Sequence, residues 1–270
     1  MRTRAASEAA EAGYEALPVN PARFAPLDPA DAAELLRGVA SHDPARALSL
    51  AFAPDEARAA ALTVCAFAAE AASITARVSD PTIGMIRVQW WREALEEAFG
   101  DGPVRAHPLA QALRRTLGPS QQPALNGMLD AVPAFLEGGG GAPADLLRPV
   151  EGATGRLLAE LVSPEADPGL AERASVTAAL AQIAAAPPPP ARSPQIETPR
   201  QRAARMMQRG ETDVPGEVAR LRKAWAAPAP AGVVLGSLPV ALAARQARGR
   251  GVGPLRARFL MTRMVARGRP

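Results

Sequence analysis

The sequence of 270 residues predicts an all-α protein. Alanine, the strongest helix former, dominates its apolar residues, and runs of β-branched residues are scarce. No segment shows the alternating apolar and polar pattern of a half-buried strand. Apolar residues instead recur at spacings of three and four between breaks made by proline and glycine, which is typical of amphipathic helices. The length allows one large helical domain or two small ones, and we expect one.

The first 20 residues are small, polar and rich in alanine, and we interpret 1–20 as a flexible N-terminal tail. The helical domain is expected to span 21–270. Its first helix should cover 26–40, with Asp28 as a candidate cap and Pro29 in the first turn. The inward face of that helix is predicted to consist of Ala32, Leu35, Leu36 and Val39.

Two long helices are expected to meet within the central stretch 70–91. The first carries 62–76 in an alanine-rich run without glycine or proline, and Asp55 is its candidate cap. The second begins at Ser79 or Asp80 and continues to about Phe99. Its apolar positions recur at spacings of three and four, which predicts an inward stripe of Ile83, Ile86, Trp90 and Ala94.

Shorter helices are predicted in the rest of the chain. They are expected to carry residues 109–117, 125–135, 157–161, 170–183, 201–209, 215–227 and 232–247. Between the fourth and the fifth, the run Pro187 to Pro190 is incompatible with a core helix and favours extended polyproline. The sequence therefore predicts a Pro-rich loop at 184–200.

The charged residues are unusually rich in arginine. The formal net charge is +4, and Lys223 is the only lysine. Arginine favours bidentate contacts with phosphate or carboxylate, so a basic nucleic-acid-binding protein is one alternative. The arginines are spread along the chain with few interleaved aromatic residues, so we do not expect nucleic acid as a partner. Cys65 is the only cysteine, which excludes an intrachain disulfide and a Cys-cluster zinc site, and its apolar surroundings predict a buried structural thiol.

Features that would direct the protein to a membrane are weak. No window approaches the run of about 20 apolar residues that spans a bilayer, and the N-terminus lacks the apolar core of a signal peptide. We therefore expect a cytoplasmic protein, with peripheral attachment to the inner membrane as an alternative. The basic, amphipathic segment 255–267 could supply that attachment, or it could be a final helix that docks on the domain.

Four short motifs follow one another in the first two thirds of the chain. An Ala-Phe-x-x-Glu motif is followed by Ser-acid-x-Thr-Ile-Gly, by Arg-x-Gln-x-Trp and later by Glu-Gly-Ala-Thr-Gly. The residues are Ala66, Phe67 and Glu70; Ser79, Asp80, Thr82, Ile83 and Gly84; Arg87, Gln89 and Trp91; and Glu151 to Gly155. In combination these motifs resemble the squalene/phytoene synthase family, and most closely the branch that includes the mitochondrial complex I assembly factor and its bacterial relatives.

The resemblance extends from about 45 to 161 and implies a terpenoid synthase-like helical bundle around a cavity. Enzymes of the family are prenyltransferases that condense prenyl diphosphates, and they hold Mg²⁺ with two Asp-rich motifs. Aligned on Phe67, the acids of the first motif fall at Ala72, Ser73 and Ala76, which cannot bind Mg²⁺ as charged ligands. The second motif is expected near 176–200, and no aspartate lies between Asp167 and Asp213.

These departures imply a pseudoenzyme without catalytic residues, metal or cofactor. The resemblance then implies a role in respiratory complex I assembly, with an assembly partner at the membrane surface, or the binding of an isoprenoid-like lipid. The alternative is an active Mg²⁺-dependent prenyltransferase of isoprenoid biosynthesis with rearranged metal ligands. The pairs Glu93/Glu97 and Glu11/Glu15 have the required spacing of four, but a solvated helix face and the tail explain them more simply.

The candidate ligand or cavity residues come from the quoted motifs and their neighbours. They are Phe67, Glu70, Ser73, Arg77, Arg87, Gln89, Trp90, Trp91, Thr154 and Gly155. The two adjacent tryptophans indicate a packed or binding surface. Glu70 lies in an apolar run, and we expect a buried pair with Arg77 or Arg87 that fixes helix packing, or else a ligand for a cationic or hydroxyl group. The small residues near Gly155 indicate either close helix packing or a path for a ligand.

The two histidines, His42 and His107, each lie close to a proline at an expected helix start. No nucleophile and acid are arranged with either of them in the sequence. We therefore interpret both as capping or solvent-exposed residues.

Overall fold

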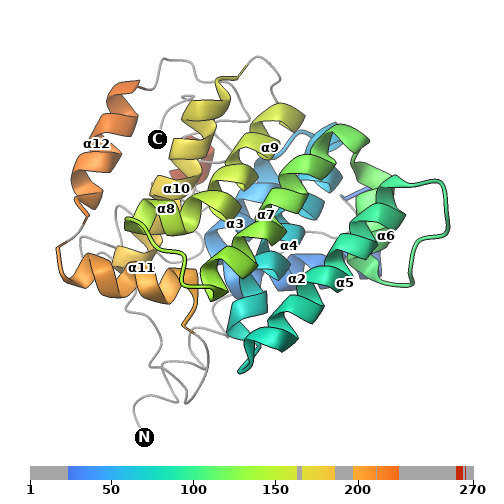
Figure 1. The fold of residues 1–270 in the computed structure, drawn as a ribbon. Coiled ribbons are helices and arrows are strands. Elements are labelled where there is room, and N and C mark those ends of the chain that lie inside the picture. The colour runs from blue at the N-terminus through green and yellow to red at the C-terminus, as the bar shows by residue number, and fades with distance from the viewer. Residues whose placement is uncertain are drawn as a thin grey trace, which may run out of the picture.

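The computed structural model describes residues 24–162, 166–185, 197–210, 212–224, 260–263 and 265. Within these ranges all regular structure is helical, which confirms the predicted fold class (Figure 1). The principal helices are α2 (Pro29–His42), α3 (Pro44–Ser49), α4 (Asp55–Ala76), α5 (Pro81–Phe99), α6 (Pro108–Thr116), α7 (Gln122–Leu136), α8 (Pro143–Leu147), α9 (Ala153–Val162), α10 (Pro168–Ala185), α11 (Pro199–Gln208) and α12 (Val214–Ala224). Short 3-10 turns η2 (Leu50–Phe52) and η3 (Pro119–Gln121) and a π-helix, η4 (Arg148–Gly152), connect some of them.

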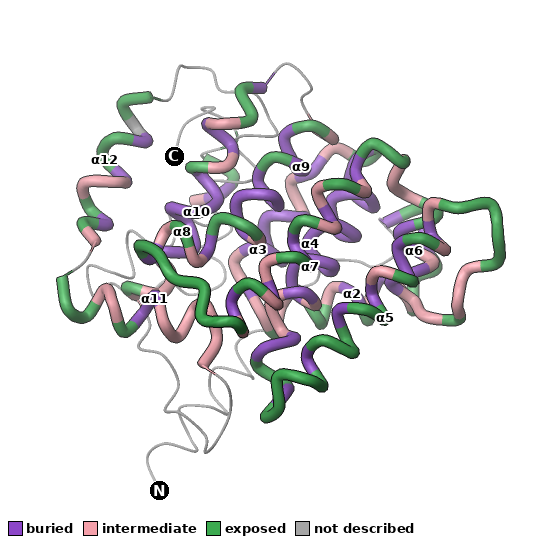
Figure 2. The backbone as a smooth tube through the Cα atoms, viewed as in Figure 1, coloured by how far each residue is buried: buried purple, intermediate pink, exposed green. Residues whose placement is uncertain are grey.

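Helix α4 lies at the centre of the bundle. It packs against α2, α6, α7 and α9, and most of its residues are buried (Figure 2). A helix that is apolar around its whole circumference is stable only when neighbouring helices surround it. Its many alanines allow those neighbours to approach closely, while Leu62, Phe67 and Ile74 supply the bulk of the core at this level.

Helix α4 corrects one expectation about membranes. Among the described residues it is the one helix that is long and apolar enough to cross a bilayer, whereas no such segment was expected from the sequence. Of its apolar window, 78% is buried inside the protein. Its composition is therefore explained by its central position in the bundle.

Most predicted caps are confirmed. Asp28 accepts a hydrogen bond from the backbone N–H of Ala30 at the start of α2, and Asp80 caps α5 in the same way. The expected cap of α4 is wrong. Pro54 occupies the cap position in a non-helical conformation, so Asp55 lies inside the first turn of α4. There its negative charge interacts favourably with the positive end of the helix dipole.

The buried face of α5 differs from the predicted stripe. The residues that face the core are Gly84, Val88, Trp91, Ala94, Leu95 and Ala98. Ile83, Ile86 and Trp90 are 48%, 64% and 38% exposed, so only Ala94 of the predicted stripe is buried. Gly84 explains the rotation, because a Cβ there would lie 3.2 Å from Cδ1 of Leu136 in α7. The glycine lets α5 approach α7 on this face, and the isoleucines point away.

The later part of the chain is described in pieces. Helix α10 ends at Ala185 and α11 begins at Pro199, so the centre of the predicted Pro-rich loop lies outside the described residues. The predicted tail 1–20 and the predicted helix 232–247 also lie outside them. Of the C-terminal helix, Met261 is fully buried in the core and Val265 is 44% exposed. The rest of the segment 255–267 lies outside the described residues.

Candidate functional site

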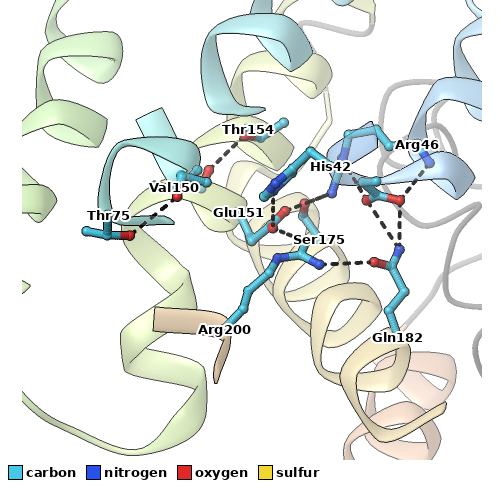
Figure 3. A network of polar contacts seen from close by, with 11 residues as sticks. His42, Arg46, Thr75, Val150, Glu151, Thr154, Ser175, Gln182 and Arg200 are labelled. Atoms are coloured by element: carbon cyan, nitrogen blue, oxygen red, sulfur yellow. Dashed lines mark hydrogen bonds and ion pairs between the residues drawn. The ribbon is translucent and has the colours of Figure 1, made fainter. Parts of the chain in front are cut away.

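A cluster of buried and half-buried polar side chains lies where α2, α3, η4, α10 and α11 meet (Figure 3). These residues come from distant parts of the chain and form one hydrogen-bonded network, which we call the polar cluster. Its members are His42, Asp43, Arg46, Glu151, Ser175, Gln182 and Arg200.

Glu151 is the centre of the polar cluster and is only 5% exposed. One carboxylate oxygen, Oε2, accepts a hydrogen bond of 3.1 Å from Nη2 of Arg46. The other, Oε1, accepts a hydrogen bond from Nη2 of Arg200 and lies 4.0 Å from Nε2 of His42. Both oxygens of the carboxylate are thus occupied by guanidinium groups from two different helices.

Arg46 and Asp43 link this centre to α10. Nη2 of Arg46 also donates to Oγ of Ser175 at 3.0 Å, and its Nε lies 3.4 Å from Oδ2 of Asp43. Asp43 accepts hydrogen bonds from the backbone N–H of Arg46 at 2.9 Å and from Nε2 of Gln182 at 3.1 Å. Gln182 in turn accepts from Arg200, which closes the network.

Local structure explains why Glu151 reaches the core. Residues Arg148–Gly152 form a π-helix between α8 and α9, and Pro149 at its start has no N–H to donate. A π-helix inserts one extra residue into the helical path and turns the following side chains. The carbonyl of Val150 is satisfied by the hydroxyl of Thr154 at 2.7 Å. Glu151 therefore points inward instead of following the exposed face of α8.

The charges in the polar cluster determine its protonation. Burial alone would raise the pKa of Glu151, but Arg200 and Arg46 outweigh it and lower that pKa to about 2. Burial lowers the pKa of His42 to about 4, and the positive charge of Arg200 adds to this effect. Burial opposes the charge on Arg46, but Glu151 and Asp43 more than compensate and raise its pKa. Glu151 is therefore ionised and His42 neutral at pH 7.

The polar cluster has balanced charge but not complete hydrogen bonding. Two carboxylates, Asp43 and Glu151, face two guanidinium groups. Nη1 of Arg46 and Nε of Arg200 are buried without a hydrogen-bond partner. Both carboxylates are engaged by arginine. The arrangement is suited to holding helices together.

The residues at the family's metal positions do not fit Mg²⁺. Ala72, Ser73 and Ala76 lie in the last turns of α4 and carry no carboxylate, and Figure 3 places Thr75 of the same turns beside Val150 of η4. On the other side, 173–185 of α10 contains no acidic residue. Among the described residues, no group of three or more His, Cys, Asp and Glu could hold a metal ion.

The candidate residues of the sequence motifs do not form one site. Phe67 and Trp91 lie in the core, where their rings meet edge to face with centroids 5.6 Å apart. Trp90 packs against Trp91 at 4.8 Å but faces outward on α5, as do Arg87 and Gln89. The tryptophan pair thus has one packed member and one surface member.

Glu70 forms the expected ion pair with Arg77, but not the expected buried one. Nη1 of Arg77 lies 3.0 Å from Oε2 of Glu70, and the Arg77 side chain is 54% exposed. Arg77 is the C-terminal cap of the helix that carries Glu70, so the pair spans two turns of α4 and fixes no packing between helices. Ser73 donates to the backbone carbonyl of Glu70 at 2.8 Å.

Thr154 and Gly155 lie in the interface of α9 and α10. A Cβ at position 155 would lie 2.4 Å from the carbonyl oxygen of Ala171 and 2.7 Å from Cβ of Ser175. The glycine therefore allows the two helix backbones to touch. Of the two interpretations of this motif, close helix packing is the one that the geometry supports.

The two histidines have different roles. His107 is the N-cap of α6, where its Nδ1 accepts from the backbone N–H of Leu109 at 3.2 Å, as predicted. His42 ends α2 instead of starting a helix, and it belongs to the polar cluster, so its interpretation as a capping or exposed residue is wrong.

Sequence reasoning missed most of the polar cluster. Asp43 is recognisable from the sequence only as a residue at a helix start, and Arg46, Ser175, Gln182 and Arg200 were not predicted. Arg46 and Glu151 are 105 residues apart, and Arg46 and Ser175 are 129 apart. The one available signal is a charged residue within an otherwise apolar segment, as at Arg46 in the run ARALSLAF.

Comparison with known proteins gives one match. No curated protein and no solved structure matches the chain significantly. The sequence profile described as squalene/phytoene synthase matches residues 39–186, which is more than half of the chain and contains all the motifs of the central stretch. The matched region runs from the end of α2 through α10, and its all-helical architecture is that of the same family. This chain belongs to the squalene/phytoene synthase family.

Proposed function

We propose that this chain is a non-catalytic member of the squalene/phytoene synthase family. The observation that carries the proposal is the pairing of Glu151 with both Arg46 and Arg200. Glu151, the acid of the Glu-Gly-Ala-Thr-Gly motif, is thereby committed to arginine, while the positions of the first motif hold alanine and serine. Without carboxylates to hold Mg²⁺, the departure of diphosphate lacks the electrophile that the reaction requires.

The resemblance of the central motifs to the complex I assembly factor branch suggests what a non-catalytic member of the family could do. We propose that the protein acts at a membrane surface in the assembly of respiratory complex I. A scaffold that keeps its helical packing but lacks reactive groups is suited to binding a partner. The two parts of the proposal are tested separately.

The catalytic part is tested with purified full-length protein. Farnesyl diphosphate and geranylgeranyl diphosphate are each incubated with the protein and Mg²⁺, and diphosphate release and extracted prenyl products are measured beside an active squalene synthase. We expect no release above the protein-free blank. Turnover of either substrate would instead support the Mg²⁺-dependent prenyltransferase alternative. Binding without turnover, seen as protection against thermal unfolding, would support an isoprenoid-like ligand.

The assembly part is tested in cells. Deletion of the gene is expected to lower the amount of mature complex I on native gels while leaving succinate dehydrogenase unchanged. Restoring the full-length gene should restore complex I. Normal complex I in the deletion strain would overturn this role without affecting the conclusion about catalysis.

A further inference from the structure

Helix α5 carries an apolar stripe on its outward face. Ile83, Ile86 and Trp90 follow one another at spacings of three and four, so they lie within about 60° of one another around the helix. Their exposed fractions are 48%, 64% and 38%, and together they are three of the five large apolar residues that are exposed among the described residues. We call these residues the α5 stripe. The opposite face of α5 is packed against α6 and α7, so the stripe lies on the side of the helix away from these neighbours.

Charge is distributed unevenly along α5. Residues 81–92 contain Arg87 and Arg92 and no acid, whereas all three acids of the helix, Glu93, Glu96 and Glu97, follow Arg92. Arg92 is paired with Asp130 of α7. Arg87 lies beside the stripe, and none of the described acidic residues forms an ion pair with it. Asp80, the N-cap just before this segment, is committed to the backbone N–H of Thr82, so the unpaired charge within the stripe itself is that of Arg87.

At the Trp90 end of the stripe, the apolar residues give way to charged ones. The guanidinium group of Arg105 lies over the ring of Trp90 at 4.4 Å and donates to its backbone carbonyl. The same guanidinium pairs with Glu93 and Glu97, and its hydrogen bonds lower the pKa of Glu97 to about 2. Trp90 thus lies between an apolar segment and an acidic one. Tryptophan with one apolar and one polar neighbour is typical of the level of lipid headgroups.

We propose that the α5 stripe is a contact site for an anionic lipid surface. Ile83 and Ile86 insert among the acyl chains, Arg87 binds headgroup phosphate, and Trp90 lies at the headgroup level with Glu93 and Glu97 in water. A guanidinium group and a helix with one apolar face are the groups that such a surface recognises. The inference rests on the proposed action at a membrane surface and extends it by naming the residues that contact lipid.

The test uses full-length protein and sedimentation with vesicles. One set of vesicles is phosphatidylcholine, and the other contains one quarter phosphatidylglycerol. We expect binding to the anionic vesicles, a loss of roughly tenfold or more in the double variant Ile83→Ser/Ile86→Ser, and a loss of about fivefold for Arg87→Gln. Met85→Ser is the matched control. Met85 is also exposed, at 39%, but it lies about 140° around the helix from Trp90, so this variant should bind normally.

Thermal unfolding shows whether the variants are folded, and since the substituted side chains are exposed their melting temperatures should equal that of the parent. Unchanged vesicle binding by the double variant would overturn the proposal, because it would place the contact elsewhere, for example at 255–267. Absence of binding to either vesicle would also overturn it, as would a dimer that the double variant abolishes. None of these outcomes bears on the activity assay, so failure here is distinguishable from failure of the proposed lack of catalysis.

Discussion

Arg46 of α3 donates a hydrogen bond of 3.1 Å to Glu151 of η4, although the two residues are 105 positions apart. Both side chains are almost completely buried, at 4% and 7% exposure. The second oxygen of Glu151 holds Arg200 of α11. One carboxylate therefore joins the beginning, the middle and the later part of the described chain.

Replacing Glu151 should destabilise the protein strongly. Glu151→Gln removes the anion between the buried Arg46 and the half-buried Arg200, and breaking one side of a buried pair costs about 3–5 kcal/mol. Urea denaturation measures the loss of unfolding free energy. The control is Glu217→Gln, since Glu217 pairs with the 65% exposed Arg220 and should cost at most about 1 kcal/mol. Equal losses in the two variants would mean that the polar cluster does not stabilise the fold.

Stability should also depend on His42. Its pKa is about 4 in the folded protein and 6.5 when unperturbed, so between these values the unfolded chain binds a proton that the folded chain does not. The contribution is complete above pH 6.5, is lost progressively as the pH falls from 6.5 to 4, and changes no further below 4. Between pH 7 and pH 5 the unfolding free energy should fall by about 2 kcal/mol from this group. His42→Gln should remove that part of the pH dependence, and an unchanged profile would contradict the assignment.

Substitution by alanine should have opposite effects on stability at two glycines, one in the contact of α9 with α10 and one on the open surface of α7. Gly155→Ala would place a Cβ 2.4 Å from the carbonyl oxygen of Ala171, so the helices must separate and the variant should lose about 1–3 kcal/mol. A Cβ at Gly127 in α7 would meet nothing within 4 Å, and Gly127→Ala should gain about 0.5–1 kcal/mol through helix propensity. Thermal unfolding of both variants checks the signs. An unchanged stability of Gly155→Ala would show that α9 and α10 can separate at this contact without cost.

The adjacent tryptophans should respond very differently to truncation. Trp91 is 3% exposed and contacts Phe67, so Trp91→Ala leaves a cavity and should cost about 3–5 kcal/mol. Trp90 is 38% exposed, and Trp90→Ala should cost about 1 kcal/mol, mainly from its contacts with Arg105 and Trp91. Denaturant midpoints of the two variants give the comparison. The reverse order would mean that α5 is rotated from the orientation described.

The single thiol should be inert in the folded protein. Cys65 is buried in α4, and burial raises its pKa to about 12 from a usual value near 9. At pH 8 this lowers the thiolate fraction on the order of a thousandfold, and the thiolate is the reactive form. Reaction with a chromogenic disulfide reagent should be slow in buffer and complete within minutes in denaturant. Rapid labelling in buffer would show that α4 opens readily.

The sequence is sufficient to predict the helices, because their signals are local. Asp28 and Asp80 are identified as caps by their position before a proline, and both make the expected hydrogen bonds. The orientation of α5 is not predictable in this way. Ile83, Ile86 and Trp90 form a regular apolar stripe, but the helix turns the neighbouring face inward because Gly84 permits the closer contact.

The polar cluster cannot be predicted from neighbouring residues in the sequence, for a different reason. Its links between separate helices join residues 18 to 139 positions apart, and a single Arg46 or Gln182 is not distinguishable from a surface residue by its neighbours. The absence of aspartate from 168–212 is visible in the sequence. The arginine–glutamate network of the polar cluster emerges only in the folded structure.

The π-helix at Arg148–Gly152 makes the chain length in this segment critical. A gene variant that lacks one codon there would let the turn relax to an ordinary α-helix and would swing Glu151 by about 100°. Arg200 would lose its carboxylate partner and Arg46 would keep only Asp43, although no charged residue had been replaced. Relatives that keep the network should therefore tolerate exchange of Val150 for another residue far better than its deletion.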